Sequence, residues 1–156
     1  MTAQIGVTIL NMPTPAESAE LILKLYDLRR EDTMRKARDF MVSFDPRTFE
    51  EFMAGFTGPN SGYVRMVTSY WEMAASLVVN GAIDAKMFLD ANGEHILTFS
   101  KVQPFLSQLR EMFQNPNVMK SLETLVLSQP DGQKRVDSTR EMIRNMIAMR
   151  SAAAKS

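Results

Sequence analysis

The stretch VRMVTSYWEMAASLVVN, residues 64–80, constrains the fold more than any other part of this sequence. On a helical wheel at about 100° per residue, its apolar side chains cover more than half of the circumference. Trp71, the only tryptophan in the chain, lies on that face, whereas Glu72 belongs to a narrow polar strip. A helix with so wide an apolar surface must contact neighbours on at least two sides. The stretch therefore predicts the central helix of an all-α bundle.

The segment after this helix carries a second carboxylate near Glu72, which raises the question of an active site. Asn80 and Gly81 predict the end of the helix, because glycine readily adopts the left-handed conformation that terminates helices. Asp84 precedes the short apolar segment 85–90, and we expect its side chain to cap the helix that begins there. The pattern therefore favours a helix end over a catalytic pair.

The chain before residue 45 predicts one long first helix. Thr14, Pro15 and Glu17 form the pattern of a capping box with proline at the first helical position. No glycine or proline occurs from Ala16 to Asp45, so we expect an uninterrupted helix of about 30 residues.

The remaining patterns predict a single-domain bundle of six or seven helices over residues 14–150. Further helices are expected at residues 47–56, 98–113, 115–128 and 137–150. Residues 1–13 are expected to form an extended N-terminal arm, because Ile5, Val7 and Ile9 alternate with polar or small residues. Residues 151–156 are expected to form a frayed tail.

Composition excludes several kinds of chemistry. The chain has no cysteine and one histidine, which rules out thiolate metal sites, cysteine nucleophiles and the paired Glu-x-x-His motifs of di-iron bundles. The histidine, His95, is predicted to be a structural or surface residue. We expect no catalytic residues, no metal site and no cofactor. Equal numbers of basic and acidic residues, 18 each, argue against nucleic-acid binding. The absence of a secretion signal and of a membrane-spanning segment predicts a cytoplasmic protein.

Three polar residues in the strongly patterned region, Glu72, Asp84 and Arg110, are predicted to form a structural cluster. If neighbouring helices bury the polar strip, a buried carboxylate needs a cationic partner. We hypothesise an ion pair between Glu72 and Arg110, with Arg65 as the alternative partner.

Two segments combine basic and other side chains in ways that leave alternatives open. In residues 29–39, RREDTMRKARD, we expect pairs of Glu31 with Arg35 and of Asp32 with Lys36, and a solvated helix is favoured over a nucleic-acid or acidic-lipid contact. The last helix carries an apolar stripe beside basic residues, comprising Met142, Ile143, Met146, Ile147 and Met149 with Arg140, Arg144 and Arg150. This stripe is expected to pack on its own domain, and it would also suit a partner's groove or weak contact with a membrane surface.

The region from Tyr63 to Val126 resembles a bacterial helical family catalogued as a domain of unknown function. The residues that carry the resemblance are Trp71, Glu72, Gly81, Ile83, Asp84, Phe99, Pro104 and Arg110. Phe99 stands where the family commonly has tryptophan. The resemblance implies a helical fold and a bacterial origin, and it implies no activity.

Two hypotheses for function follow. The first is a non-enzymatic interaction module that forms a homo-oligomer, expected to be a homodimer, because the long first helix and the arm expose apolar surface. The alternative is a bundle that binds a small apolar or amphipathic ligand in a pocket formed by Trp71, Met73, Phe105 and Met112.

Overall fold

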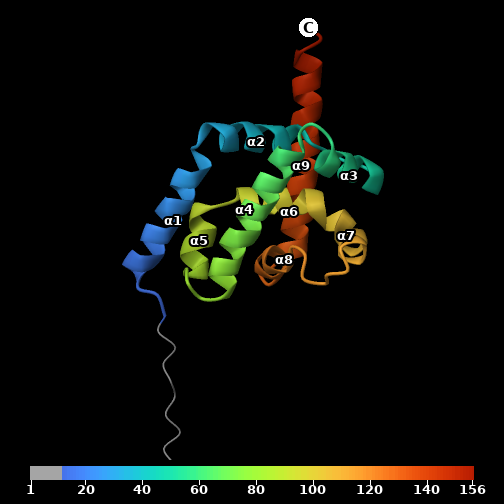
Figure 1. Ribbon diagram of the computed structural model, residues 1–156. Coiled ribbons are helices and arrows are strands. Elements are labelled where there is room, and N and C mark those ends of the chain that lie inside the picture. Colours follow the sequence, from blue (N-terminus) through green and yellow to red (C-terminus); the bar gives the residue numbers. More distant parts are fainter. Residues whose placement is uncertain (1–11) are drawn as a thin grey trace, which may run out of the picture.

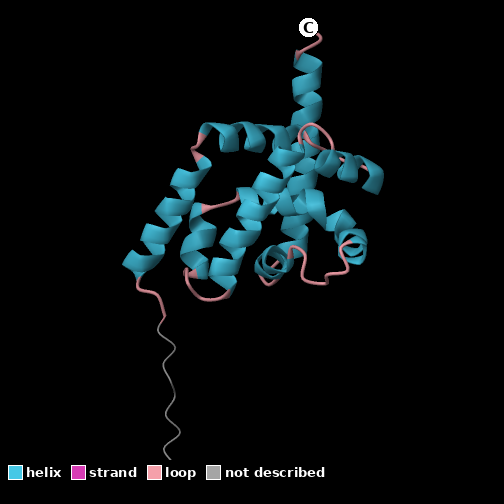
Figure 2. Cartoon of the chain, in the orientation of Figure 1, coloured by secondary structure: helices cyan, strands magenta, loops and turns pink. Residues whose placement is uncertain are grey.

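The computed structural model describes residues 12–156, which contain helices and loops only (Figures 1 and 2). The prediction of an all-α fold is therefore confirmed for this part of the chain. An extended arm was expected at residues 1–13, and residues 1–11 of it lie outside the described part of the chain. The elements are α1 (Pro15–Arg29), α2 (Asp32–Ser43), α3 (Phe49–Thr57), α4 (Ser61–Val79), α5 (Ala85–Ala91), α6 (Glu94–Val102), the 3-10 turn η1 (Gln103–Phe105), α7 (Leu106–Met112), α8 (Lys120–Leu127) and α9 (Gly132–Ala153).

The expected long first helix is wrong, because the chain bends between α1 and α2 (Figure 1). The capping box at Thr14 and Glu17 is present and starts α1. Glu31 then acts as the N-cap of α2, and its carboxylate accepts the backbone N–H groups of Thr33 at 3.0 Å and Met34 at 2.9 Å. These two hydrogen bonds hold the pKa of Glu31 below its usual value. A side-chain cap thus ends one helix and begins the next without glycine or proline.

The prediction of which residues form ion pairs within residues 29–39 is also wrong. Because Glu31 caps α2, it does not pair with Arg35, whose guanidinium instead lies 4.0 Å from Asp32. The helix expected over residues 98–113 is likewise divided, since α6 already begins at Glu94 and η1, which contains Pro104, separates it from α7. Because of these breaks, residues 12–156 contain more helices than the six or seven that the sequence predicted.

Helix α4 is the central helix, as predicted, and it packs against α2, α3, α5, α6 and α8. Trp71 on α4 is fully buried, with its ring edge-on to Tyr70 at a centroid distance of 4.9 Å. The Tyr70 hydroxyl donates a hydrogen bond of 2.6 Å to the backbone carbonyl of Leu25, which ties α1 to the core. His95 on α6 is buried in the same aromatic cluster.

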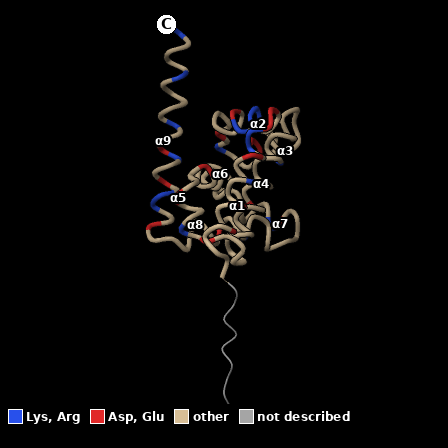
Figure 3. The backbone as a smooth tube through the Cα atoms, turned by 90° about the vertical axis from the view of Figure 1, so that its left-hand side faces the viewer, with Lys and Arg blue, Asp and Glu red and all other residues tan. Residues whose placement is uncertain are grey.

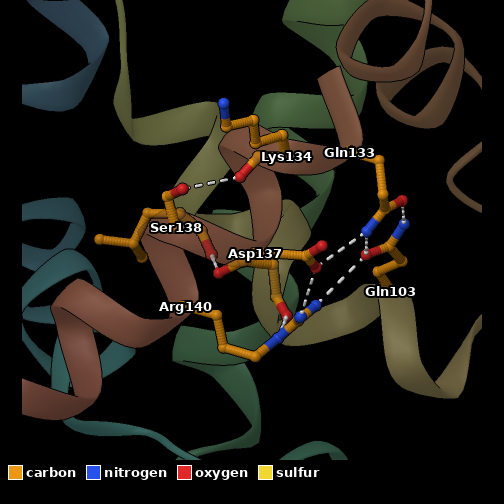
Figure 4. A network of polar contacts seen from close by, with 8 residues as sticks. Gln103, Gln133, Lys134, Asp137, Ser138 and Arg140 are labelled. Carbon is orange, nitrogen blue, oxygen red and sulfur yellow. Dashed lines mark hydrogen bonds and ion pairs between the residues drawn. The ribbon is translucent and has the colours of Figure 1, made fainter. Parts of the chain in front are cut away.

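Helix α9 packs on α6 and α8 through its first half and extends past the other helices with its second half (Figures 1 and 3). Val136 and Ile143 are its buried contacts. A polar network fixes the same half, in which Arg140 contacts both Asp137 and Gln103 (Figure 4). Past Ile147 every residue of α9 is exposed. The outer part of the helix is therefore without support from its own domain.

Over residues 12–156, none of the helices combines the length and the apolar character needed to cross a membrane.

Candidate ligand groove

An open groove of about 690 Å³ lies beside the central helix, bounded by α3, α4, α7 and the loop between α7 and α8. Most of its lining is apolar, and the apolar residues are Phe56, Met66, Val102, Leu109, Phe113, Val118 and Met119. Val102 and Leu109 are buried and form the floor, whereas Phe113 is 55% exposed and forms part of the rim. The groove therefore lies on top of the packed core and is not a defect within it.

Near its start, helix α4 leaves space along one wall of the groove. Gly62 lines the groove, and a Cβ atom added to it would meet no atom within 4 Å. Glycine inside a helix costs about 0.5–1 kcal/mol relative to alanine, so this position gives up helix stability while it leaves space. Gly62 thus marks a part of the groove wall where a larger side chain has room.

The opposite wall is the loop between α7 and α8, which contains strained backbone. Gln114 and Met119 adopt left-handed conformations with φ of 49° and 55°. Such conformations cost about 1 kcal/mol or more in residues other than glycine and persist only where the surroundings impose them. Arg110 imposes part of this geometry, because its Nε donates to the carbonyl of Val118 at 3.0 Å. The loop wall is thereby held in one place.

Glu72 also holds this wall, and it does so without the hypothesised ion pair to Arg110. Its two carboxylate oxygens accept the backbone N–H groups of Ser121 at 2.9 Å and Leu122 at 2.8 Å. These are free amides at the start of α8, and the N-cap residue itself, Met119, offers no side chain to accept them. Glu72 therefore caps α8 from another helix.

Arg110 pairs with Glu123 of α8 instead, at 3.1 Å between Nη1 and Oε2. Partial burial opposes ionisation of Glu123, but hydrogen bonds from Lys120 and Arg110 outweigh it and hold the pKa of Glu123 below its usual value. The structure thus brings Glu72 and Arg110 to the same segment, the start of α8, through different partners.

Asp84, the third member of the predicted cluster, lies elsewhere. It is the N-cap of α5, as predicted, and its carboxylate accepts the N–H of Met87 at 2.8 Å. Its own N–H donates to the hydroxyl of Ser18 on α1 at 2.9 Å. Asp84 therefore joins α1 to α5 and takes no part in the groove.

The four residues of the predicted pocket do not line the groove. Trp71 and Phe105 are core residues, with 0% and 6% of their surface exposed, whereas Met73 and Met112 lie on the outside at 42% and 45%. The pocket was expected on the Trp71 face of α4, but that face is filled by neighbouring helices. The groove lies instead along the side of α4 that carries the polar strip.

The polar side chains of α4 in the groove mostly bond to their own helix. The Thr68 and Ser69 hydroxyls donate to the carbonyls of Val64 and Met66 at 2.8 and 3.2 Å. Arg65 is exposed, and its Nε donates to the carbonyl of Ser61 at 3.3 Å. The surface that the groove presents is consequently apolar, with one guanidinium at its edge.

The groove shows no arrangement for acid–base or metal chemistry. Within residues 12–156 no group of three His, Asp or Glu side chains is placed to hold a metal ion. His95 lies in the core with 1% exposure, where burial and the positive charge of Arg135 lower its pKa to about 4. The main chemical feature of the groove is therefore its apolar lining.

The fold and the groove define a class: an all-α domain with an apolar surface groove held open beside its central helix. The chain belongs to the family described as a domain of unknown function (DUF4760), whose model matches residues 14–128. The match covers α1 to α8, and therefore the whole groove, and it ends before α9. Neither the curated proteins nor the solved structures contained a match to the chain.

Proposed function

We propose that this protein is a non-enzymatic binding domain that holds a small apolar or amphipathic molecule in the groove. The observation that carries the proposal is the groove itself, about 690 Å³ with a largely apolar lining. Pockets for small molecules commonly have volumes of about 300–1,000 Å³ and are lined mainly by apolar side chains with a few polar groups. The groove has both properties.

The fixed walls of the groove support the proposal further. Glu72 and Arg110 tie the start of α8 and the preceding loop to α4 and α7 through hydrogen bonds of 2.8–3.1 Å. A site whose walls are already in place loses less conformational entropy on binding than a site that must be ordered. Exposed apolar side chains such as Phe113 also gain from being covered, since burial of apolar surface is worth about 25 cal/mol per Å².

The test is isothermal titration calorimetry with 1-decanol and sodium decanoate, which share one alkyl chain and differ in charge. We expect saturable binding of at least one of them by the wild-type protein. Gly62→Trp fills the open wall and should weaken binding at least about tenfold, since it occupies the space that the ligand needs. Gly93→Trp is the matched control, because Gly93 also has no atom within 4 Å of an added Cβ and lies outside the groove.

A wild-type protein that binds neither compound would contradict the proposal. Equal affinity in the wild type and in Gly62→Trp would show that the compounds bind elsewhere.

A methionine stripe along α9 favours a second function, self-association as a homodimer. Met142, Met146 and Met149 are 53%, 37% and 65% exposed and recur at the alternating spacing of four and three residues found in coiled-coil seams. Arg140 donates a hydrogen bond to the carbonyl of Ser100, and Arg144 donates one to the carboxylate of Asp45. Both arginines therefore bind the rest of the domain, and the methionine stripe is the main feature of the outer face. A second copy of α9 would cover this stripe with an identical one.

Sedimentation equilibrium tests the dimer. We expect concentration-dependent mass above 17.6 kDa for the wild type and a monomer for Met146→Glu. Met73→Glu changes an equally exposed methionine on α4 and serves as the control. A wild type that stays monomeric at high concentration refutes self-association, and flotation with anionic vesicles that Met149→Glu abolishes would assign α9 to a membrane surface instead.

A further inference from the structure

Four arginines line a hollow of about 350 Å³ at the bend between α1 and α2, which we call the arginine pocket. Its lining consists of Tyr26, Arg29, Arg30, Arg35 and Arg38. The bend lies away from α7 and the groove loop (Figure 1), so this pocket is separate from the groove. No carboxylate is part of the lining.

Arg29 is the residue that most clearly lacks an acceptor. It is half-buried, and its guanidinium lies over the rings of Trp71 and Tyr26, at 5.2 and 5.5 Å from their centroids. Its Nε is buried without a hydrogen-bond partner, and among residues 12–156 no carboxylate lies within 4.0 Å of it. The positive charge of Arg29 thus has no carboxylate partner in this part of the chain, and an anion in the hollow would supply one to its terminal N–H groups.

The other three arginines differ in how far they are neutralised. Arg38 binds Glu94 through three hydrogen bonds of 2.7–3.1 Å, which fixes its side chain in place. Arg30 and Arg35 form only long pairs, with Asp27 at 3.7 Å and Asp32 at 4.0 Å, whose side chains are mostly exposed. Exposed pairs of this kind contribute little to stability, so both guanidinium groups can turn to another anion at little cost.

The bend brings these side chains around one hollow. Arg29 is the last residue of α1 and Arg30 is its C-cap, whereas Arg35 and Arg38 lie in the first two turns of α2. In an uninterrupted helix the four residues would be spread over roughly 14 Å of helix length. Helix α2 carries both basic and acidic residues (Figure 3), but the acidic ones lie outside the pocket lining.

We propose that the arginine pocket binds a phosphate group. Guanidinium groups match phosphate oxygens through paired hydrogen bonds, and a tetrahedral, doubly charged anion can accept from several arginines at once. A planar carboxylate would satisfy fewer of them. The phosphate can belong to a small soluble molecule or to a lipid headgroup, and both present the same oxygens to the pocket.

Trp71 provides the readout, because Arg29 lies over its ring and it is the only tryptophan in the chain. Sodium phosphate is titrated into the intact protein and the emission of Trp71 is followed, with sodium chloride at matched ionic strength as the reference. We expect a saturable change with phosphate only. Vesicles containing phosphatidic acid form a second arm, compared with vesicles of phosphatidylcholine.

Arg35→Gln is the test variant, because Arg35 is exposed, whereas loss of Arg29 would disturb the packing on Trp71. It should weaken the saturable response about tenfold, the effect of losing one hydrogen bond to a charged group. Arg150→Gln on the outer part of α9 is the control and should leave the response unchanged. A saturable response to phosphatidic acid vesicles alone, lost in Arg35→Gln, supports the proposal with a lipid source. Identical responses to phosphate and chloride without a vesicle response, or equal affinity in Arg35→Gln, overturn it.

Discussion

The stability of this domain should fall as the solution is acidified from pH 7.5 to pH 5, because of His95. The imidazole is 1% exposed, lies 5.4 Å from the ring of Phe88 between centroids, and has no hydrogen-bond partner on either ring nitrogen. Burial and the charge of Arg135 lower its pKa from 6.5 to about 4 in the folded protein. Between these two values the unfolded chain binds a proton that the folded protein does not.

The sign and size of the effect follow from that difference. A group whose pKa is lowered by folding contributes its full stability above the unfolded pKa and loses it as the pH falls toward the folded pKa. At about 1.4 kcal/mol per pH unit, the change from 6.5 to about 4 corresponds to about 3 kcal/mol in total. About 2 kcal/mol of this should be lost by pH 5.

The assay is urea denaturation at pH 7.5, 6 and 5, followed by the emission of the buried Trp71. His95→Phe is the control variant, since it keeps an aromatic ring beside Phe88 and removes the only histidine in the chain. Its free energy of unfolding should be nearly constant over this range. Carboxyl groups with lowered pKa values, such as Asp45, titrate at lower pH. A wild type that is equally stable at pH 7.5 and 5, or a variant with the same pH dependence, would refute this account of His95.

Four further predictions concern stability and can be checked by the same urea denaturation at neutral pH. Gly62→Ala should stabilise the protein by about 0.5–1 kcal/mol, because the helix gains and the added Cβ meets nothing. Gly132→Ala should destabilise it by about 2 kcal/mol, because the same atom would overlap the carbonyl of Val126. Glu72→Ala should cost about 2 kcal/mol and speed amide exchange at the start of α8, which loses its cap. Tyr70→Phe should cost about 1 kcal/mol, since the hydroxyl bond to α1 is buried. A destabilising Gly62→Ala, a neutral or stabilising Gly132→Ala, a neutral Glu72→Ala or a neutral Tyr70→Phe would each refute the corresponding reasoning.

The features that the sequence predicted correctly depend on local chemistry. The capping box at Thr14, the N-cap at Asp84 and the end of α4 near Gly81 each follow from a few neighbouring residues, and each is present. The central position of α4 followed from how much of its surface is apolar, since only a helix with neighbours on several sides can bury that much.

The features that the sequence did not predict depend on tertiary contacts or on a choice between two local structures. Glu31 could continue a helix or cap a new one, and it caps α2, which packs on the central helix α4. Glu72 was expected to pair with an arginine side chain. Its partners are backbone amides instead, and no pattern of side chains in the sequence reveals such a contact. The groove was not predicted for a related reason, because the loop that forms its far wall is distant from α4 in the sequence.

The most direct test of the groove is a methyl NMR titration of the protein labelled at its methionine methyl groups, with 1-decanol as the ligand. The chain has 13 methionines, which report on every region of interest. Met66 and Met119 line the groove, Met34 and Met41 lie in the core, and Met142 and Met149 lie on the outer part of α9. If the groove is the binding site, the signals of Met66 and Met119 shift saturably while the other four stay in place. Shifts confined to the core or to α9, with Met66 and Met119 unchanged, would contradict the proposed function.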